Sequence, residues 1–284
     1  MSETNHVIVI GAGAAGMLAA IAAAREGAAV ELWEQNEKPG KKLFITGKGR
    51  CNVTNACDME ELLGSVVSNS KFLYSSFYGF TNQDMMDLLE QAGLRLKVER
   101  GNRVFPQSDK SSDVISALSA LLRQAGVRVC LNQKAEGLAV EEGVCKGVRC
   151  GGRIQTADRV IVATGGLSYP TTGSTGDGLK WAADSGHRLT ELSPALVPIE
   201  VKETETVKEL QGLSLKNIEA AVYDGKKELY REFGEMLFTH FGVSGPVLLS
   251  ASSFCAKAIR KRPLRLVIDL KPALSWEQLD ERIL

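Results

Sequence analysis

The chain has 284 residues, of which 44% are hydrophobic and 24% charged, a composition typical of a folded protein and not of a disordered or fibrous one. At about 150 residues per domain, this length predicts roughly two domains. The 34 basic and 34 acidic side chains cancel, so the chain has no net positive field to attract nucleic acid or an anionic membrane. We therefore expect a small-molecule protein with no nucleic-acid and no membrane partner.

The cysteines and histidines predict neither a disulfide framework nor a metal centre. The six cysteines contain no CxxC pair, and with only three histidines they offer no zinc-type spacing. Reduced thiols in a cytoplasmic protein are the simplest interpretation. The apolar stretch 7–24 is rich in Gly and Ala at its start and has no basic segment before it, so we assign it to a buried strand and a helix.

The first 34 residues predict a β–α–β unit. A β-branched run at 6–10 reads as a buried strand, an Ala-rich segment over 16–26 as a helix closed by Gly27, and 28–34 as a second strand. The parallel crossover between the two strands should be right-handed.

A glycine-rich turn joins the first strand to the helix of this unit. Gly11, Gly13 and Gly16 form a GxGxxG pattern, with Ala14 and Ala15 between the last two, and Glu34 ends the next strand 18 positions later. The first glycine allows a tight turn, the second a close approach of backbone N–H groups to a pyrophosphate, and the third close packing of helix on strand. A carboxylate at Glu34 can accept hydrogen bonds from ribose hydroxyls. This arrangement predicts dinucleotide binding.

Further elements follow the same reasoning along the chain. Two amphipathic helices, each followed by glycine, and two short buried strands are expected before residue 165, with hairpin segments between the strands. The expected helices are 83–92 and 113–124, the strands 127–131 and 159–163, and the hairpin segments 137–149 and 152–155.

Two other glycine-containing segments favour FAD over NAD as the dinucleotide. Ala163, Thr164, Gly165 and Gly166 follow the strand at 159–163, and such an ATG segment is common near FAD in flavoproteins of the two-dinucleotide type. A structural loop is the alternative interpretation.

The other segment is a basic, loop-rich stretch at 39–55. Its backbone and amide donors suit an extended phosphate chain or an anionic flavin ring; a solvated lysine loop is the alternative. Cys51 has no partner at CxxC distance, which favours a packed or flavin-lining cysteine over a reactive one.

The pattern changes after Pro194. Strands are expected at 197–201, 218–223, 228–232 and 264–270, and helices at 247–259 and from Trp276 to Leu284. Asp224-Gly225 should close a hairpin. We expect a FAD-binding domain over 1–193 and a β-rich domain over 194–284.

Four segments of the chain resemble the motifs of a known family. The segments GAGAAG, GKKLFITGKGRCNVTN, ATGGLSYPTTGSTGDG and GEMLFTHFGVSGP are similar to motifs of bacterial NAD(P)/FAD-dependent oxidoreductases related to aminoacetone oxidase and to a bile-acid dehydro-reductase. The resemblance implies an α/β fold: a Rossmann-like two-dinucleotide FAD domain with an inserted β-rich, barrel-like substrate-side domain and the start of a helical region.

The resemblance also implies a set of FAD contacts. It assigns the diphosphate to Gly11–Gly16, ribose to Glu34 with Gln35 beside it, and adenine to the neighbourhood of Ala135. The flavin side would be contacted by Lys42, Gly49, Arg50, Cys51 and Asn52, and by Ala163, Thr164, Gly165 and Gly166. Members of the family return to the FAD domain with a C-terminal glycine-rich segment. Since this chain ends at Leu284, we expect an incomplete piece that binds FAD weakly.

The resulting prediction is a redox enzyme in which FAD exchanges a hydride with a small organic substrate, with NAD(P)H, as a transient reductant, or dioxygen as the redox partner. The alternatives are a flavin-dependent RNA-modifying protein and a non-catalytic FAD-binding remnant. Because a flavin supplies its own redox chemistry, the sequence assigns no catalytic residue. His240 and Tyr169 are candidates, and a structural role is the alternative for each.

Overall fold

The computed structural model describes residues 4–283, so Leu284 and the first three residues lie outside the described residues. Contacts divide the chain into two compact units, one ending at Leu189 and the other beginning at Thr190. The expected domain limits, 1–193 and 194–284, and the assignment of the second domain as an insertion stay predictions.

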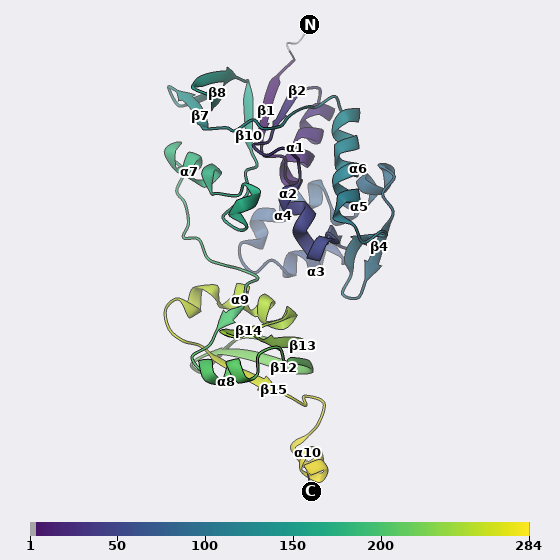
Figure 1. Cartoon of the computed structure of the whole chain (residues 1–284), viewed down its shortest axis with the longest axis vertical. Coiled ribbons are helices and arrows are strands. Elements are labelled where there is room, and N and C mark those ends of the chain that lie inside the picture. The colour runs from purple at the N-terminus through teal and green to yellow at the C-terminus, as the bar shows by residue number, and fades with distance from the viewer. Residues whose placement is uncertain (1–3, 284) are drawn as a thin grey trace. The chain divides into compact units, whose positions relative to one another are not determined.

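A four-stranded parallel sheet is the centre of the first unit (Figure 1). Its order is β10 (Arg159–Val162), β1 (His6–Ile10), β2 (Ala29–Trp33) and β6 (Arg128–Cys130), and all three neighbouring pairs are parallel. Four of the five residues of β1 are buried, as expected for a strand that is covered on both faces of a parallel sheet. All four expected strands are confirmed.

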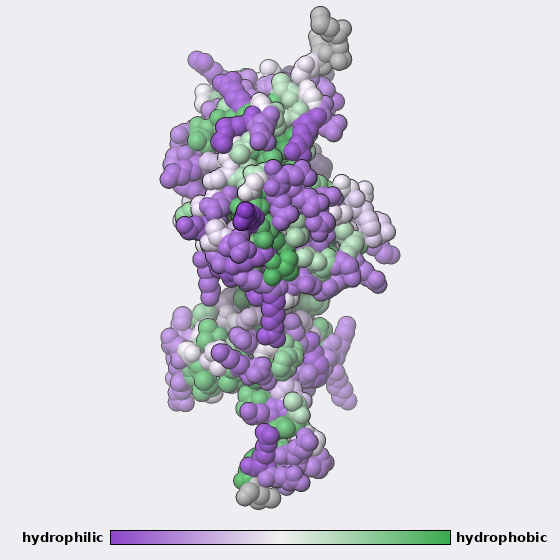
Figure 2. All heavy atoms as spheres, turned by 90° about the vertical axis from the view of Figure 1, so that its right-hand side faces the viewer, coloured by the Kyte–Doolittle hydropathy of each residue, from purple (hydrophilic) through white to green (hydrophobic). Residues whose placement is uncertain are grey.

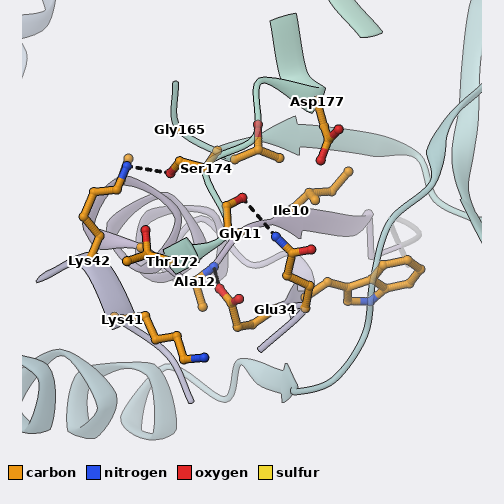
Figure 3. A pocket seen from close by; sticks show the side chains of 18 of the residues that line it. Ile10, Gly11, Ala12, Glu34, Lys41, Lys42, Gly165, Thr172, Ser174 and Asp177 are labelled. Carbon is orange, nitrogen blue, oxygen red and sulfur yellow. Dashed lines mark hydrogen bonds between the residues drawn. The ribbon is translucent and has the colours of Figure 1, made fainter. Parts of the chain in front are cut away.

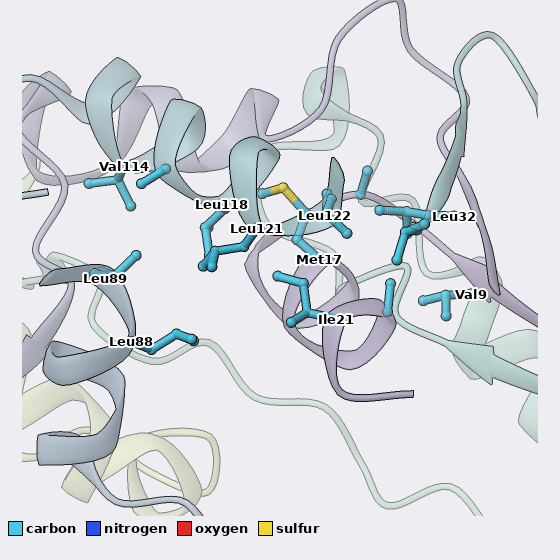
Figure 4. Packing of buried hydrophobic residues seen from close by; sticks show 14 of the residues in the cluster. Val9, Met17, Ile21, Leu32, Leu88, Leu89, Val114, Leu118, Leu121 and Leu122 are labelled. Carbon is cyan, nitrogen blue, oxygen red and sulfur yellow. The ribbon is translucent and has the colours of Figure 1, made fainter. Parts of the chain in front are cut away.

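One face of this sheet packs on α1 (Ala14–Arg25) and α6 (Ser111–Gln124). Figure 4 shows Met17 of α1 lying beside Leu122 of α6 and near Leu32 of β2, and all three side chains are almost fully buried. The chain leaves α1 through Gly27, whose φ of +88° suits a residue without Cβ. Because most side chains of α1 are the small ones of alanine, the helix and the turn before it can lie close to the sheet.

Trp33, Trp181 and Val148 belong to a second hydrophobic cluster. Val148 lies in an antiparallel sheet of three strands, which the sequence predicted as hairpin segments. These strands are β7 (Gly137–Glu141), β8 (Val144–Cys150) and β9 (Arg153–Thr156).

Several short elements surround this framework. The expected helix 83–92 is α5 (Asn82–Gln91), where Thr81 and Asp84 form a capping box. The stretch expected to be loop-rich contains a short helix, α2 (Lys41–Ile45), and a 3₁₀ turn, η1 (Thr46–Gly49). The sequence did not predict α3 (Met59–Gly64), α4 (Ser70–Gly79), η2 (Pro170–Thr172), α7 (Asp177–Asp184) or the sheet of β3 (Thr54–Asn55), β5 (Arg103–Pro106) and β4 (Leu96–Glu99).

The second unit is built on a five-stranded antiparallel sheet, which confirms a β-rich module. Its core includes Ile218, Met236 and Leu248. The strand order is β11 (Ile199–Glu200), β14 (Gly242–Ser244), β13 (Lys227–Phe238), β12 (Ser214–Asp224) and β15 (Arg265–Asp269). The helices are α8 (Thr204–Glu209), α9 (Pro246–Ile259) and α10 (Trp276–Ile283).

The predicted turn at Asp224-Gly225 is confirmed, since Asp224 pairs with Lys227 across it and Gly225 has a φ of +62°. On the face drawn in Figure 2, hydrophilic residues predominate, with hydrophobic residues exposed between them. Within residues 4–283, no helix has both the length and the apolar character needed to cross a bilayer.

Candidate cofactor site

A pocket of about 270 Å³ lies where the four parallel strands end. Residues that directly follow the strands, or come within five positions of them, line it, as expected for a ligand site of an open α/β sheet. Those residues are Gly11–Ala15 after β1, Glu34 and Gln35 after β2, Gln133–Ala135 after β6, and Ala163–Gly165 after β10. Figure 3 shows the Glu34 side chain reaching Ala12, with a dashed line for the hydrogen bond between them.

The three glycines of the GxGxxG turn have different surroundings. A Cβ on Gly16 would lie 1.7 Å from the carbonyl oxygen of Gly11, and a Cβ on Gly11 would lie 2.6 Å from that of Ala163. No atom lies within 4 Å of a Cβ built on Gly13, which lines the pocket. Gly11 and Gly16 therefore allow close packing of backbone, whereas the space beside Gly13 is open to a ligand.

Glu34 holds the turn at the centre of the pocket. Its carboxylate accepts hydrogen bonds from the backbone N–H groups of Ala12 and Asn36, both at 2.9 Å, and from Asn36 Nδ2 at 2.6 Å. The side chain is buried. The carboxylate thus ties the end of β2 to the turn after β1, and it also lines the pocket.

Two adjacent lysines enter the pocket from α2 with different partners. Lys41 Nζ lies 3.0 Å from a carboxylate oxygen of Glu37 and 3.2 Å from Asn36 Oδ1. Lys42 Nζ donates to Ser174 Oγ at 2.6 Å and to Ser168 Oγ at 3.4 Å. Within residues 4–283, no carboxylate lies within 4 Å of Lys42.

The loop after β10 forms the remaining wall. Gln35 Nε2 donates to the Gly173 carbonyl at 2.9 Å, which links this loop to the end of β2. Gly173 has a φ of +104°, which favours glycine, and a Cβ there would lie 2.6 Å from Gln35 Nε2 and would displace this amide. Asp177 and Trp181 of α7 complete the wall.

The predicted contact residues thus fall into two groups. The pocket contains eleven of them: Gly11, Gly13, Ala14, Ala15, Glu34, Gln35, Lys42, Ala135, Ala163, Thr164 and Gly165. It is not lined by Gly16, Gly49, Arg50, Cys51, Asn52 or Gly166.

Arg50 belongs to a network of ion pairs. Its guanidinium lies 2.5 Å from Glu99 and 2.6 Å from Asp109 and stacks on Phe105, with 4.2 Å between Cζ and the ring centroid. Lys97 completes the network, at 2.6 Å from Asp109 and 3.5 Å from Glu99. Arg50 therefore links its loop to β4 and to the segment after β5.

The other residues of this motif have structural contacts. Cys51 is 1% exposed in the main core, and burial raises the pKa of its thiol, which agrees with a packed rather than a reactive cysteine. The Asn52 amide is assigned with its nitrogen donating to the carbonyls of Thr54 at 3.0 Å and Val104 at 3.2 Å, since the opposite orientation sets oxygen against oxygen.

The Arg50 network predicts acid sensitivity. Hydrogen bonds from Arg50 and Lys97 lower the pKa values of Glu99 and Asp109 below their ordinary 4.5 and 3.8. A carboxylate whose pKa is depressed in the folded state stabilises the fold above its ordinary pKa, and this contribution is lost as pH falls through the folded pKa. We expect the urea midpoint to drop less between pH 5 and pH 3 in Arg50→Gln than in the wild type.

The control is Asp184→Asn, which breaks an exposed pair with Lys180 and should leave the acid dependence of the urea midpoint close to that of the wild type. If the urea midpoint fell by the same amount between pH 5 and pH 3 in Arg50→Gln and in the wild type, the network would contribute nothing to the acid sensitivity.

Other pocket residues contribute packing or single polar contacts and were not among the predicted contacts. They are Ile10, Trp33, Gly40, Lys41, Leu43, Thr46, Gln133, Lys134, Thr172, Gly173, Ser174, Asp177 and Trp181. The segment ATGGLSYPTTGSTGDG contains Gly173 and Gly176 and indicates a loop there, but it does not indicate which of its side chains line the pocket.

Neither candidate catalytic residue is placed in this pocket. Tyr169 is 63% exposed and is not a lining residue. His240 is an exposed residue of the second unit, with its ring 4.9 Å from that of Phe241. The described residues include no group of three or more His, Cys, Asp and Glu side chains that could hold a metal ion.

A model described as the HI0933-like protein Rossmann domain matches residues 5–255. The chain belongs to the HI0933-like family. This finding confirms the predicted Rossmann-type fold of the first unit and the resemblance drawn from the four sequence motifs.

Curated relatives of this HI0933-like chain include enzymes of two kinds. It is 34% identical over 282 residues to a 3-dehydro-bile acid delta(4,6)-reductase of Clostridium scindens, covering 97% of this chain and 66% of the relative. It is 30% identical over 252 residues to a ribosomal RNA dihydrouridine synthase of Escherichia coli, covering 89% and 61%. The chain therefore spans less than two thirds of the length of these relatives.

Solved structures share the fold at lower identity. A flavocytochrome c3 fumarate reductase is 24% identical, with a TM-score of 0.52 over 76% of this chain and 47% of that one. A 3-ketosteroid delta1-dehydrogenase from Sterolibacterium denitrificans is 16% identical, with a TM-score of 0.53 over 75% and 62%.

Proposed function

We propose that this chain binds FAD in the pocket at the ends of the parallel strands and forms the cofactor-binding part of an oxidoreductase. The observation that carries the proposal is the glycine turn between β1 and α1: Gly11 and Gly16 fit only without side chains, while the space beside Gly13 is open. A buried carboxylate, Glu34, stands at the end of the next strand. These features suit a diphosphate and its neighbouring ribose.

The pocket residues fit the parts of FAD in the order of the strands. The ribose would lie at Glu34 and the adenine near Ala135, beyond β2 and β6. The backbone N–H groups of Gly13–Ala15, at the N-terminus of α1, would bind the diphosphate. The flavin half would then extend past the end of β10, toward Gly165. FAD, when bound, supplies two-electron redox chemistry as hydride transfer.

We further propose that the reaction is the reduction of a carbon–carbon double bond next to a carbonyl group in a small organic substrate. The names of both curated relatives support this class: one reduces delta-4,6 bonds of a 3-dehydro bile acid, and the other forms dihydrouridine from uridine in RNA. The greater identity to the bile-acid enzyme favours a small-molecule substrate, and NAD(P)H is the proposed reductant. The free cysteines among the described residues suit a cytoplasmic protein.

The experiment loads the 284-residue chain with FAD and adds NADH or NADPH without oxygen. We expect bleaching of the flavin absorbance, and its return on addition of a steroid 4-en-3-one. Air is the control oxidant. Return with air but not with the enone would contradict reduction of a small-molecule enone.

The same experiment tests the second candidate, reduction of uridine in RNA, which the dihydrouridine synthase relative favours. A uridine-containing ribosomal RNA fragment that reoxidises the flavin, where the enone does not, would support that candidate. Absence of FAD binding would contradict the proposal as a whole.

A further inference from the structure

Lys42 has an unusual environment for a cation in a pocket. Its side chain is half-buried, and the oxygen atoms that its ammonium group contacts are the hydroxyls of Ser174, which is 7% exposed, and Ser168. Lys41 next to it has a carboxylate partner in Glu37. Among the described residues, Lys42 is thus held in place by neutral groups, and its positive charge is available to a ligand.

The position of Lys42 assigns it to one end of an extended dinucleotide. Lys42 Nζ lies 4.0 Å from a Cβ built on Gly165, which follows β10. Because the strand order is β10-β1-β2-β6, a ligand with its ribose at Glu34 and its diphosphate at the β1 turn has its other half at β10. In Figure 3, Lys42 and Ser174 lie on one side of Ala12 and Glu34 on the other.

Lys42 lies at the proposed flavin end of the pocket, whereas other groups are assigned to the diphosphate and the ribose. The N-terminus of α1 would face the diphosphate, and the Glu34 carboxylate, which accepts three N–H donors and would accept the ribose, lies away from Lys42. Reduction by a hydride from the donor adds two electrons and one proton to the flavin ring, which leaves one negative charge on the ring. A cation beside the ring favours that charged state over the neutral oxidised state.

We infer that Lys42 stabilises the negative charge of the reduced flavin and that Ser174 holds the lysine beside the ring. This inference rests on the proposed function. Lys42 would thereby make the flavin easier to reduce. This role differs from a simple contact with the diphosphate, which carries the same charge in both redox states.

The test measures the midpoint potential of FAD bound to the 284-residue chain, by anaerobic titration against a reference dye. In Lys42→Gln we expect the equilibrium constant for reduction of the bound flavin to fall about tenfold. This change lowers the midpoint potential by about 30 mV for a two-electron couple. Lys42→Arg should stay close to the wild type because it keeps the charge. Lys38→Gln, which removes a charge outside this pocket, is the matched control.

Sulfite gives a second readout, because its addition to flavin also places a negative charge on the ring. The sulfite dissociation constant should rise about tenfold in Lys42→Gln and remain unchanged in Lys38→Gln. Ser174→Ala keeps the cation but removes its buried partner, and it should shift the potential in the same direction by a smaller amount. This variant also tests the inference if Lys42→Gln does not fold.

The outcomes separate this inference from the proposed function. If Lys42→Gln binds FAD more weakly but keeps the wild-type potential, Lys42 is a phosphate contact and the inference is wrong. An unchanged potential in Ser174→Ala would likewise overturn the positioning role of Ser174. If the wild-type chain binds no FAD, the proposed function fails, and the inference fails with it.

Discussion

Replacing Gly16 with alanine should destabilise the first unit by about 3 kcal/mol, at the upper end of what overpacking a core usually costs. The reason is the 1.7 Å between the added Cβ and the Gly11 carbonyl oxygen, which is backbone and cannot rotate away. The whole turn between β1 and α1 would have to move. Urea unfolding followed by circular dichroism measures the loss.

Gly13→Ala is the matched control in the same turn. Because no atom lies within 4 Å of its Cβ, its stability should stay within about 1 kcal/mol of the wild type, the scale of an altered helix N-cap. The methyl group would enter the pocket where the diphosphate is expected, so FAD affinity should fall at least about tenfold. Equal destabilisation by the two substitutions would refute this division between packing and binding.

Removing the carboxylate of Glu34 should have the second largest effect. Glu34→Ala leaves the fully buried N–H of Ala12 and the backbone N–H of Asn36 without their acceptor, and leaves Asn36 Nδ2 with the Thr172 carbonyl alone. A buried donor that loses its partner costs about 1–3 kcal/mol, so we expect a loss of about 2–3 kcal/mol in unfolding free energy of the FAD-free chain.

Glu34→Gln keeps the shape and one acceptor oxygen, and it should lose about half as much. Glu37→Gln serves as the control because this side chain is 58% exposed, and it should change stability by less than about 0.5 kcal/mol. If Glu34→Ala were as stable as Glu37→Gln, the carboxylate would have no part in holding the turn.

The β–α–β unit could be predicted from sequence because its signals are local. The strand 6–10, the Ala-rich helix and the glycines between them lie within about 20 residues, and each favours the same structure. The sheet of β3, β5 and β4 had no such signal, since its strands are two to four residues long and β3 pairs with β5 across about 50 positions.

The site was predictable to the extent that its residues directly follow strands, as Glu34 and Ala163 do. Arg50 shows the limit. Beside Cys51 and Asn52 it reads as a ligand residue, but its partners Glu99 and Asp109 lie 49 and 59 positions away. Spacing along the chain does not indicate that these carboxylates meet the guanidinium, so the ion-pair network could not be predicted from the sequence, and the flavin contact of Arg50 stays a prediction.

The pairing of β1 with β10 has a consequence for how the protein acquires its cofactor. Val7 pairs with Arg159, so about 150 residues must be synthesised after β1 before its second neighbour exists. Contacts between such distant segments form slowly, because a long loop must close first. We therefore expect the pocket to be assembled late in folding, and FAD to act as a ligand that captures the completed sheet and shifts the folding equilibrium toward it by mass action.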